Sequence, residues 1–492
     1  MSSNQTTISS ATPYQGNDKL LFGMIMGVVA FWLFAQTTLN IAPDMERSLG
    51  IESSVMNIAV SITALFSGMF IVVMGGLADR LGRMKILNLG FILSIIGALL
   101  IGLAPSGVLA MPFLMLGRVV QGLSAACIMP ASLALVKTYW DGPARQRAVS
   151  MWSIGSWGGS GLCSFVGGLM SQNLGWRSIF FVCAAVSVLG LLMVRGTPES
   201  KVENQDPGYK FDFPGVITFM ITMIALQIVV TQGAKLGWAS MATIGLVIVT
   251  FVFGALFFWF EGRARNSFVD FKLFRNPIFT GATISNFLLN GVAGMLIVSL
   301  QLVQLGGNMT AQQAGFLTIG YAVAIIAFIR VGEKLLQRFG ARQPMIWGCL
   351  ITGLSIMLLL PTNLMLEQYK IIAVISYILF GIGLAFYATP STDAALSNLP
   401  AEQAGSGAGI YKMASSLGAA FGVAISAAIF TALRGDASSI SWLGDVVPFV
   451  GRQDNIAVRE AATVALMFNL LMVLAAIVSI ALTVPKGKKT AS

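Results

Sequence analysis

The chain has 492 residues, of which 56% are hydrophobic and 10% are charged, with a formal net charge of +10. So few polar residues could not cover the surface of a soluble core, and the apolar stretches are too long and continuous for β-barrel strands. The cations are scattered between these stretches without the basic patch that nucleic acid requires, so we expect no nucleic-acid partner.

Fourteen stretches are long and apolar enough to be membrane-spanning helices. They lie at about 20–42, 55–75, 86–104, 109–136, 148–170, 178–194, 214–232, 238–260, 279–305, 314–331, 343–361, 371–390, 405–432 and 461–484. The first run lacks a cleavage site and is predicted to be a retained span, not a signal peptide. Lys and Arg are about three times as frequent on one side, which predicts that both termini are cytoplasmic.

The two halves of the chain repeat each other. Asp79-Arg80-Leu81-Gly82 corresponds to Gln337-Arg338-Phe339-Gly340, and Met129-Pro130-Ala131-Ser132 to Thr389-Pro390-Ser391-Thr392. We therefore expect an all-α polytopic protein of two six-helix bundles with two inserted helices. The predicted parts are a tail (1–19), the first bundle (20–196), a linker with the inserted pair (197–262), the second bundle (263–485) and a tail (486–492). An outside loop at 433–460 could form an interfacial helix, a hairpin or a re-entrant segment.

Histidine is absent, and the four cysteines (Cys127, Cys163, Cys183 and Cys349) lie within apolar runs. We therefore expect no disulfide framework, no metal site and no cofactor, and any proton carrier has to be a carboxylate. Without histidine, a nucleotide-binding loop or a nucleophile constellation, the chain is not expected to be an enzyme.

The segment from Gly75 to Leu87 concentrates one acid and three bases between two apolar runs. One interpretation is a solvated connector whose cations follow the positive-inside rule. The other is a short, rigid loop that locks one conformation of a transporter. The candidate gating residues are Gly76, Asp79, Arg80, Gly82 and Arg83.

Charged residues within spans are the candidates for proton coupling, because each costs about 2.5–3.5 kcal/mol at the centre of a helix. Arg118 either extends to the outer membrane surface or has a function inside the span. Asp393 and Lys412 form either a structural ion pair or a pair whose protonation follows the conformation. Asp44, at the outer mouth, is either a solvated acid or a second proton carrier.

Uncharged polar residues form stripes on two spans. Trp32, Gln36 and Asn40 follow one face of the first span, and Thr283, Asn286, Asn290, Gly294, Ile297, Gln301 and Gln304 follow one face of the ninth. Such stripes either bond helices together or line a cavity. The span at 148–170 is rich in glycine, which permits close helix packing and bending.

Several motifs resemble the major facilitator superfamily. They include the loop at 75–83, GRVVQGLSAACIMPA (117–131), WSIGSWGGSG (152–161), YATPSTD (387–393) and AGIYKMASSLG (408–418). Nearly the whole chain resembles the fourteen-span drug:proton antiporter branch, in particular the NorB/NorC-type quinolone and multidrug efflux pumps. The resemblance implies a substrate cavity lined by Trp32, Gln36, Asn40, Gln121, Asn286, Asn290 and Tyr387. It implies an antiporter motif at Gly155, Gly159, Gly167 and Gly168, although Cys163-Ser164 replaces the usual Gly-Pro, and a proton-coupling role for Arg118.

The implied function is proton-driven export of amphiphilic, often cationic drugs, such as quinolones, quaternary ammonium biocides and dyes, by alternating access. The expected partners are the lipid bilayer, drug substrates and protons, and we expect a monomer in the bacterial cytoplasmic membrane. The chain departs from this branch at one important position: Ala35 stands where many members of the branch carry an aspartate. The alternatives are an exporter of a single metabolite or biocide, and a non-transporting receptor or sensor, for which no loop is long enough to hold a signalling domain.

Overall fold

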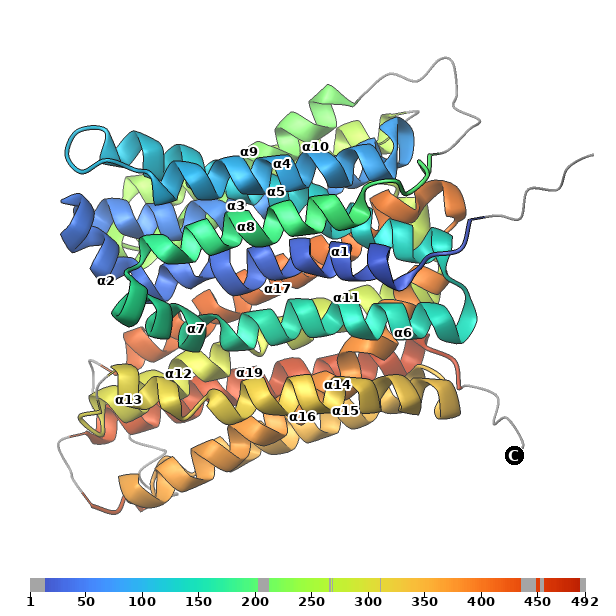
Figure 1. The fold of residues 1–492 in the computed structure, drawn as a ribbon. Coiled ribbons are helices and arrows are strands. Elements are labelled where there is room, and N and C mark those ends of the chain that lie inside the picture. Colours follow the sequence, from blue (N-terminus) through green and yellow to red (C-terminus); the bar gives the residue numbers. More distant parts are fainter. Residues whose placement is uncertain are drawn as a thin grey trace, which may run out of the picture.

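The structure is a computed structural model that describes residues 14–201, 212–264, 267, 269–309, 311–434, 448–451 and 455–486. Within these ranges all regular elements are helices, and most run side by side along one direction (Figure 1). We name the two ends of this bundle by the chain. The termini end is where α1 begins and α19 ends, and the far end is where α2 and α13 lie (Figure 1). Most of the predicted outside loop, at 435–447 and 452–454, lies outside the described residues.

The first span of the chain is not one regular α-helix, because a π-helical turn and a 3-10 turn interrupt it. The helices of the first half are α1 (Asp18–Val29), η1 (Ala30–Phe34), η2 (Ala35–Thr37), α2 (Thr38–Leu49), α3 (Ser53–Leu81), α4 (Arg83–Gly102), α5 (Ala110–Tyr139), α6 (Gly142–Ser153), η3 (Ile154–Gly158), α7 (Gly159–Leu174) and α8 (Arg177–Val194). The helices α6, η3 and α7 follow one another without a gap.

The second half follows an inserted pair, α9 (Phe213–Leu236) and α10 (Met241–Arg263). Its helices are η4 (Phe271–Arg275), α11 (Pro277–Gly291), α12 (Gly294–Leu305), α13 (Ala311–Phe316), α14 (Ile319–Phe339), α15 (Arg342–Leu359), α16 (Leu366–Ser397), η5 (Ala401–Gln403), α17 (Ala404–Leu433) and α19 (Ile456–Thr483). The predicted span at 279–305 is found as one apolar segment from Pro277 to Leu305, in which two turn residues separate α11 from α12.

Twelve helices in the described part of the chain are long and apolar enough to cross a membrane. Two of the fourteen predicted spans fall outside this number. The stretch at 148–170 is helical throughout but is not among the twelve, and the apolar part of α9, Phe213–Val229, is shorter than the other spans. The chain is thus a multi-pass helical protein.

Equivalent contacts recur in the two halves. Arg177, at the start of α8, donates to the backbone oxygens of Gly102, the last residue of α4, and Ala104, just beyond it. Arg459, near the start of α19, donates in the same way to residues beyond the end of α15, over 2.6 Å to the Thr362 oxygen. Both arginines donate to backbone carbonyls at or just after a helix end. The repeat predicted from the sequence is therefore visible in these contacts.

The inserted pair packs against the outside of both halves. The two helices pack on each other, and α9 contacts α3 and α17. The other helix, α10, leaves Phe251, Phe258 and Trp259 exposed. In a membrane such a surface faces lipid, because water would not tolerate a contiguous apolar surface of this kind.

Candidate functional site

The two halves meet tightly at the termini end, where Asp79 accepts hydrogen bonds from the first turn of α17. Its Oδ1 accepts from the backbone N–H of Gly405 over 2.8 Å, and its Oδ2 accepts from the N–H of Ser406 over 2.9 Å. A carboxylate at a helix N-terminus satisfies N–H groups that lack partners and interacts favourably with the helix dipole. Asp79 belongs to the first half and α17 to the second, so these bonds join the halves.

Arg83 extends the same contact. Its guanidinium donates to Asp79 Oδ1 over 2.8 Å, to the carbonyl of Ala401 over 2.7 Å and to Thr138 Oγ1 over 2.6 Å. Asp79 and Arg83 are almost fully buried, and a buried ion pair is stable only when further hydrogen bonds satisfy both partners. We call these residues, with Gly405 and Ser406, the α17 latch. The loop that the sequence predicts to be a gate therefore contacts the second half of the chain.

Glu199 holds the turn that carries the α17 latch. Its carboxylate accepts from the backbone N–H groups of Met84, over 2.8 Å, and Lys85, over 3.1 Å, in the first turn of α4. Gly82, between α3 and α4, has a φ of +123°, and a side chain there would collide with the Glu199 carboxylate. The sequence predicted Gly82 but not Glu199, because a lone acid after the last span of the first bundle has no recognisable spacing.

A second contact between the halves lies at the same end. Arg145 of α6 donates through Nε to Asp393 Oδ1 of α16 over 2.9 Å, and through Nη2 to Ser397 Oγ over 2.8 Å. Lys137 donates to the Ser397 carbonyl over 3.3 Å. We call these four residues the α16 latch. The expected ion pair between Asp393 and Lys412 is therefore wrong, because Asp393 pairs with an arginine from the other half.

Lys412 has a different neighbour. Its ammonium lies 4.9 Å from the ring centroid of Trp152, on α6 of the other half, and both side chains are buried. Trp152 is fixed in turn, because its Nε1 donates to Ser132 Oγ over 2.9 Å. A buried cation over an indole ring is favourably placed, so Lys412 also contributes to the contact between the halves.

Arg118 is fully buried in the first half, which excludes an arginine that extends to the membrane surface. Its guanidinium donates to the backbone oxygens of Ala35 over 2.7 Å, Ala59 over 2.9 Å and Val60 over 3.3 Å, and to Gln121 Oε1 over 2.9 Å. Ala35 begins the 3-10 turn η2, where the regular helical bonding of the first span is interrupted. At Ala35, where the family resemblance would place an aspartate, a backbone carbonyl receives the arginine.

The predicted cavity residues of the second half are joined by hydrogen bonds. Asn290 Nδ2 donates to Asn286 Oδ1 over 2.9 Å, and Asn286 Nδ2 donates to Ser415 Oγ over 2.6 Å and to the Tyr411 carbonyl over 3.0 Å. Asn286 is buried, whereas Asn290 is half-buried at the edge of this network. The two asparagines therefore tie α11 to α17.

Hydroxyl groups continue from this network toward the α16 latch. The Tyr387 hydroxyl lies 2.6 Å from Ser285 Oγ and accepts from Ser391 Oγ over 2.9 Å, and Ser391 Oγ lies 2.9 Å from the Tyr411 hydroxyl. Thr392 Oγ1 lies 3.3 Å from the same Tyr411 hydroxyl and precedes Asp393 in the chain. The sequence had singled out Tyr387 alone from this group.

The cavity residues predicted in the first half are not joined in this way. Trp32 Nε1 and Gln121 Nε2 are buried and have no hydrogen-bond partner in the described part of the chain. Gln36 is half-buried in η2, and the side chain of Asn40 lies outside the described residues. The structure thus brings together the predicted cavity residues of the second half, but not those of the first.

The glycines predicted as an antiporter motif contact the first span. A side chain at Gly155 would lie 3.1 Å from Ile25, one at Gly159 would lie 3.2 Å from Trp32 Cβ, and one at Gly167 would collide with Thr37. A side chain at Gly168 would meet nothing within 4 Å. Three of the four glycines therefore permit the helix from α6 to α7 to pack closely against the first span. The fourth, Gly168, makes no such contact.

Gly168 lines a cavity of about 490 Å³ at the far end. The first half contributes residues of α2 and α7, and the second half contributes residues of α12, of α14 and around α13. Asp44 also lines it, and this carboxylate accepts from Arg47 and from Ser171 Oγ, each over 2.6 Å. We call this space the far-end cavity.

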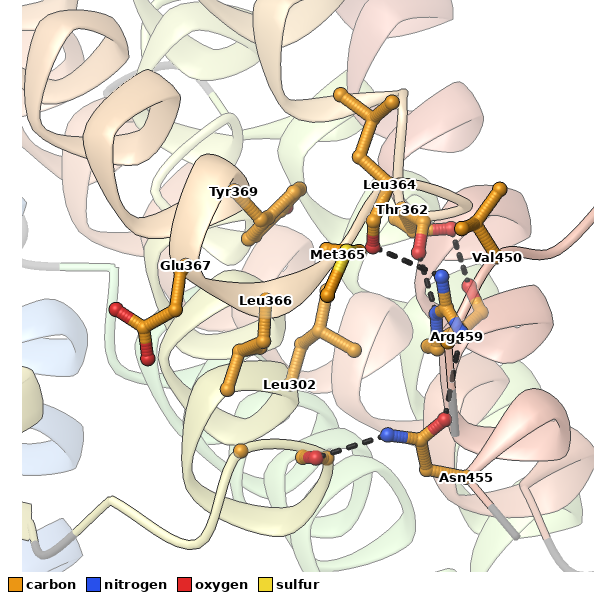
Figure 2. A pocket seen from close by; sticks show the side chains of 13 residues that line it. Leu302, Thr362, Leu364, Met365, Leu366, Glu367, Tyr369, Val450, Asn455 and Arg459 are labelled. Atoms are coloured by element: carbon orange, nitrogen blue, oxygen red, sulfur yellow. Dashed lines mark hydrogen bonds between the residues drawn. The ribbon is translucent and has the colours of Figure 1, made fainter. Parts of the chain in front are cut away.

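A smaller pocket of about 200 Å³ lies at the far end of the second half (Figure 2). Its polar groups bond with one another: Arg459 donates to the carbonyl oxygens of Thr362 and Leu364, and Asn455 Nδ2 donates to the Gly306 oxygen over 2.9 Å. These polar groups already have partners, so we assign the pocket to the packing of Arg459 against the residues that follow α15.

The chain is similar to known proteins over nearly its whole length. The Major Facilitator Superfamily matches the chain over residues 21–423 and 281–489. The quinolone resistance protein NorB of Staphylococcus aureus strain MRSA252 is 47% identical over 481 residues, which are 98% of this chain and 99% of that protein. NorB of strain COL is 46% identical over the same length.

Solved structures show the same fold at low sequence identity. The proton:xylose symporter XylE bound to 6-bromo-6-deoxy-D-glucose has a TM-score of 0.61 at 16% identity, covering 96% of this chain and 95% of that one. A bacterial homologue of the iron transporter ferroportin, in an outward-facing state, has a TM-score of 0.60 at 12% identity, covering 94% and 98%.

The chain therefore belongs to the major facilitator superfamily, as its loop motif predicted. It is a multi-pass membrane transporter and not an enzyme. The resemblance to the NorB-type pumps holds over nearly the whole chain.

Proposed function

We propose that the protein is a proton-coupled multidrug antiporter that exports amphiphilic drugs, including quinolones and organic cations, across the bacterial cytoplasmic membrane. In this proposal the chain crosses the membrane fourteen times. Twelve of these spans are the long apolar helices, and the other two are the continuous helix from α6 to α7 and the helix α9. Both termini are cytoplasmic, so the termini end is the cytoplasmic side. In this proposal the limits of the two bundles, the inserted pair and the tails are the ones that the sequence predicts.

One observation carries the proposal. Both latches between the halves lie at the termini end, whereas the cavity lined by both halves lies at the far end. Two halves that close at one end and open at the other are what alternating access requires. The identity to NorB, a quinolone resistance protein, supports drugs as the substrates and export as the direction.

Asp393 is the proposed proton carrier, because its charge holds the α16 latch. Protonation would remove the negative charge and weaken its pairing with Arg145, which favours opening at the cytoplasmic side. Release of the proton there would restore the latch. The hydroxyl groups of Tyr411 and Thr392 bring exchangeable protons to the residue next to Asp393.

The remaining sites have supporting roles in this proposal. Asn286, Asn290 and Tyr387 contact the drug in the central cavity, with Trp32, Gln36, Asn40 and Gln121 on the opposite side. Arg118 and Lys412 are fixed positive charges, and Asp44 acts at the outer mouth. One proton that enters for each neutral drug molecule that leaves contributes about 2.3 kcal/mol per 100 mV, which sustains roughly a fiftyfold drug gradient.

The test is a resistance panel in an efflux-deficient host that produces the protein, with and without an uncoupler. We expect raised inhibitory concentrations for several chemically unrelated amphiphiles, and we expect the uncoupler to remove the difference. Resistance to one compound alone would identify an exporter of a single substrate instead. Resistance that survives the uncoupler would rule out proton coupling.

A further inference from the structure

The far-end cavity has one charged lining residue, Asp44. The rest of its wall is uncharged: Phe165 and Phe316 are among the apolar side chains, Gln172 and Gln304 are amides, and Thr318 carries a hydroxyl. Its volume of about 490 Å³ lies within the range of sites that hold drug-sized molecules. A molecule that fits here therefore has a bulky apolar body and at most one strong charge.

The charge that fits is positive. Asp44 has an exposed partner in Arg47, whose side chain is 79% exposed, so the pair is weak and a cationic ligand can compete with it. A carboxylate also offers more acceptor positions than the two bonds that it makes here. On the opposite wall, residues 276–329 of the second half contain no charged side chain at all. This wall therefore supplies no fixed cation that would favour an anion.

Two glycines keep the cavity open, one from each half. A Cβ atom built at Gly168 of α7, or at Gly315 of α13, would meet nothing within 4 Å, and both residues line the cavity. Where the cavity ends, α7 and α14 touch, since a side chain at Gly161 would lie 3.1 Å from Ala322. The space thus depends on the separation of the two halves at the far end.

We propose that the far-end cavity is a binding site for lipophilic monovalent cations, with Asp44 as their charge partner. The site is distinct from the central cavity, because none of the seven residues predicted for that cavity lines it. In the proposed export cycle, on which this use of the site rests, it is where a cationic drug lies before release to the outside. A ligand bound between the halves at the far end favours the state with both latches closed.

The test measures binding of radiolabelled tetraphenylphosphonium and tetraphenylborate to the purified full-length protein in nanodiscs, with empty nanodiscs subtracted. The two ions share size and shape but carry opposite charges. We expect the phosphonium to bind more tightly than the borate. Asp44→Asn is expected to raise the Kd for the phosphonium about tenfold and to leave the Kd for the borate within a factor of two.

Gly315→Leu is expected to reduce binding of both ions at least tenfold, since it fills the cavity from the second half. The matched controls are Glu367→Gln, another far-end acid that pairs with a base three residues later, and Gly245→Leu, a glycine on α10 with equally open surroundings. Both are expected to bind like the native protein.

Native affinity for the phosphonium in Asp44→Asn would overturn the charge assignment, and native affinity in Gly315→Leu would overturn the location. This binding assay needs no proton gradient and no turnover. Failure of drug export in the resistance panel with intact binding here would therefore contradict the proposed function alone. Intact export without this binding would contradict the far-end site alone.

Discussion

Asp79 and Gly405 lie 326 residues apart in the chain, yet the Asp79 carboxylate accepts a 2.8 Å hydrogen bond from the Gly405 N–H. The backbones approach so closely that a side chain at Gly405 would collide with the Gly75 carbonyl oxygen. This single contact joins the motif loop of the first half to the first turn of α17 in the second. It makes the loop part of the closed end of the transporter.

Asp79→Asn is expected to slow transport about tenfold without changing which drugs bind. An asparagine can still cap α17 but loses the charge that strengthens its bonds to the Gly405 and Ser406 N–H groups and to Arg83. The measurement is the initial rate of drug transport in proteoliposomes, together with drug binding. The control is Asp141→Asn, an acid that precedes α6 without a capping bond from its side chain. A shift in substrate range with normal turnover would contradict the gating role.

Gly405→Ala is expected to abolish transport, because the added methyl group would separate α3 from α17 and lie 2.8 Å from the native position of Asp79 Oδ1. Gly68→Ala is the matched control on α3, since a side chain there meets nothing within 4 Å. Transport rate is the first measurement, and thermal unfolding in detergent shows that the variant is folded. Equal transport by the two variants would refute the close approach of the helices.

Asp393→Asn is expected to abolish proton-driven efflux while drug binding stays measurable, because the side chain can no longer gain or lose a proton. Arg145→Gln breaks the same latch but leaves the carboxylate in place. We therefore expect it to transport slowly with a residual dependence on the pH gradient, which the asparagine variant lacks. Unchanged drug accumulation in cells that carry Asp393→Asn would exclude the carrier role.

Arg118→Lys is expected to destabilise the protein and stop transport. One ammonium group cannot replace a guanidinium that bonds to three backbone oxygens and to Gln121. Thermal unfolding in detergent measures the loss, for which we expect a midpoint several degrees lower. Arg177→Lys is the comparison, since that arginine bonds to two backbone oxygens at the far end and is not buried among the spans. A larger loss for Arg177→Lys would contradict the importance of the Arg118 site.

Asn290→Leu is expected to change the drug spectrum and not to stop turnover. Asn290 is the half-buried edge of the network in the second half, so its loss leaves the inner bonds from Asn286 to Ser415 and Tyr411 in place. A resistance panel with Asn173→Leu, an exposed far-end asparagine, as the control measures the effect. Uniform loss of resistance to every compound would count against the cavity role.

The sequence predicted the helices and their repeat, because each span has to be apolar along its own length and so carries its own signal. It also singled out the loop at 75–83, whose order of glycines and charges is local. It did not predict the ion pair between Arg145 and Asp393, which lie 248 residues apart. That pair depends on how two bundles are rotated against each other, and no local pattern encodes this rotation.

The errors have the same origin. Lys412 and Asp393 were paired in the prediction because their helices are neighbours in the chain, but the Lys412 side chain contacts Trp152 of the other half. The polar stripe on the ninth span was expected to be continuous, but the turn between α11 and α12 divides it. Asn286 and Asn290 join the network in the second half, while Gln304 lines the far-end cavity. A helical periodicity cannot predict where a helix stops being regular.

The most direct test of proton-coupled export is transport of a fluoroquinolone into inside-out-oriented proteoliposomes that are acidified inside, compared with vesicles without a pH gradient. Our account predicts accumulation that requires the gradient, alkalinises the lumen as drug enters, and is lost in Asp393→Asn. Equal drug entry with and without the gradient, in vesicles whose native protein binds the drug, would contradict it.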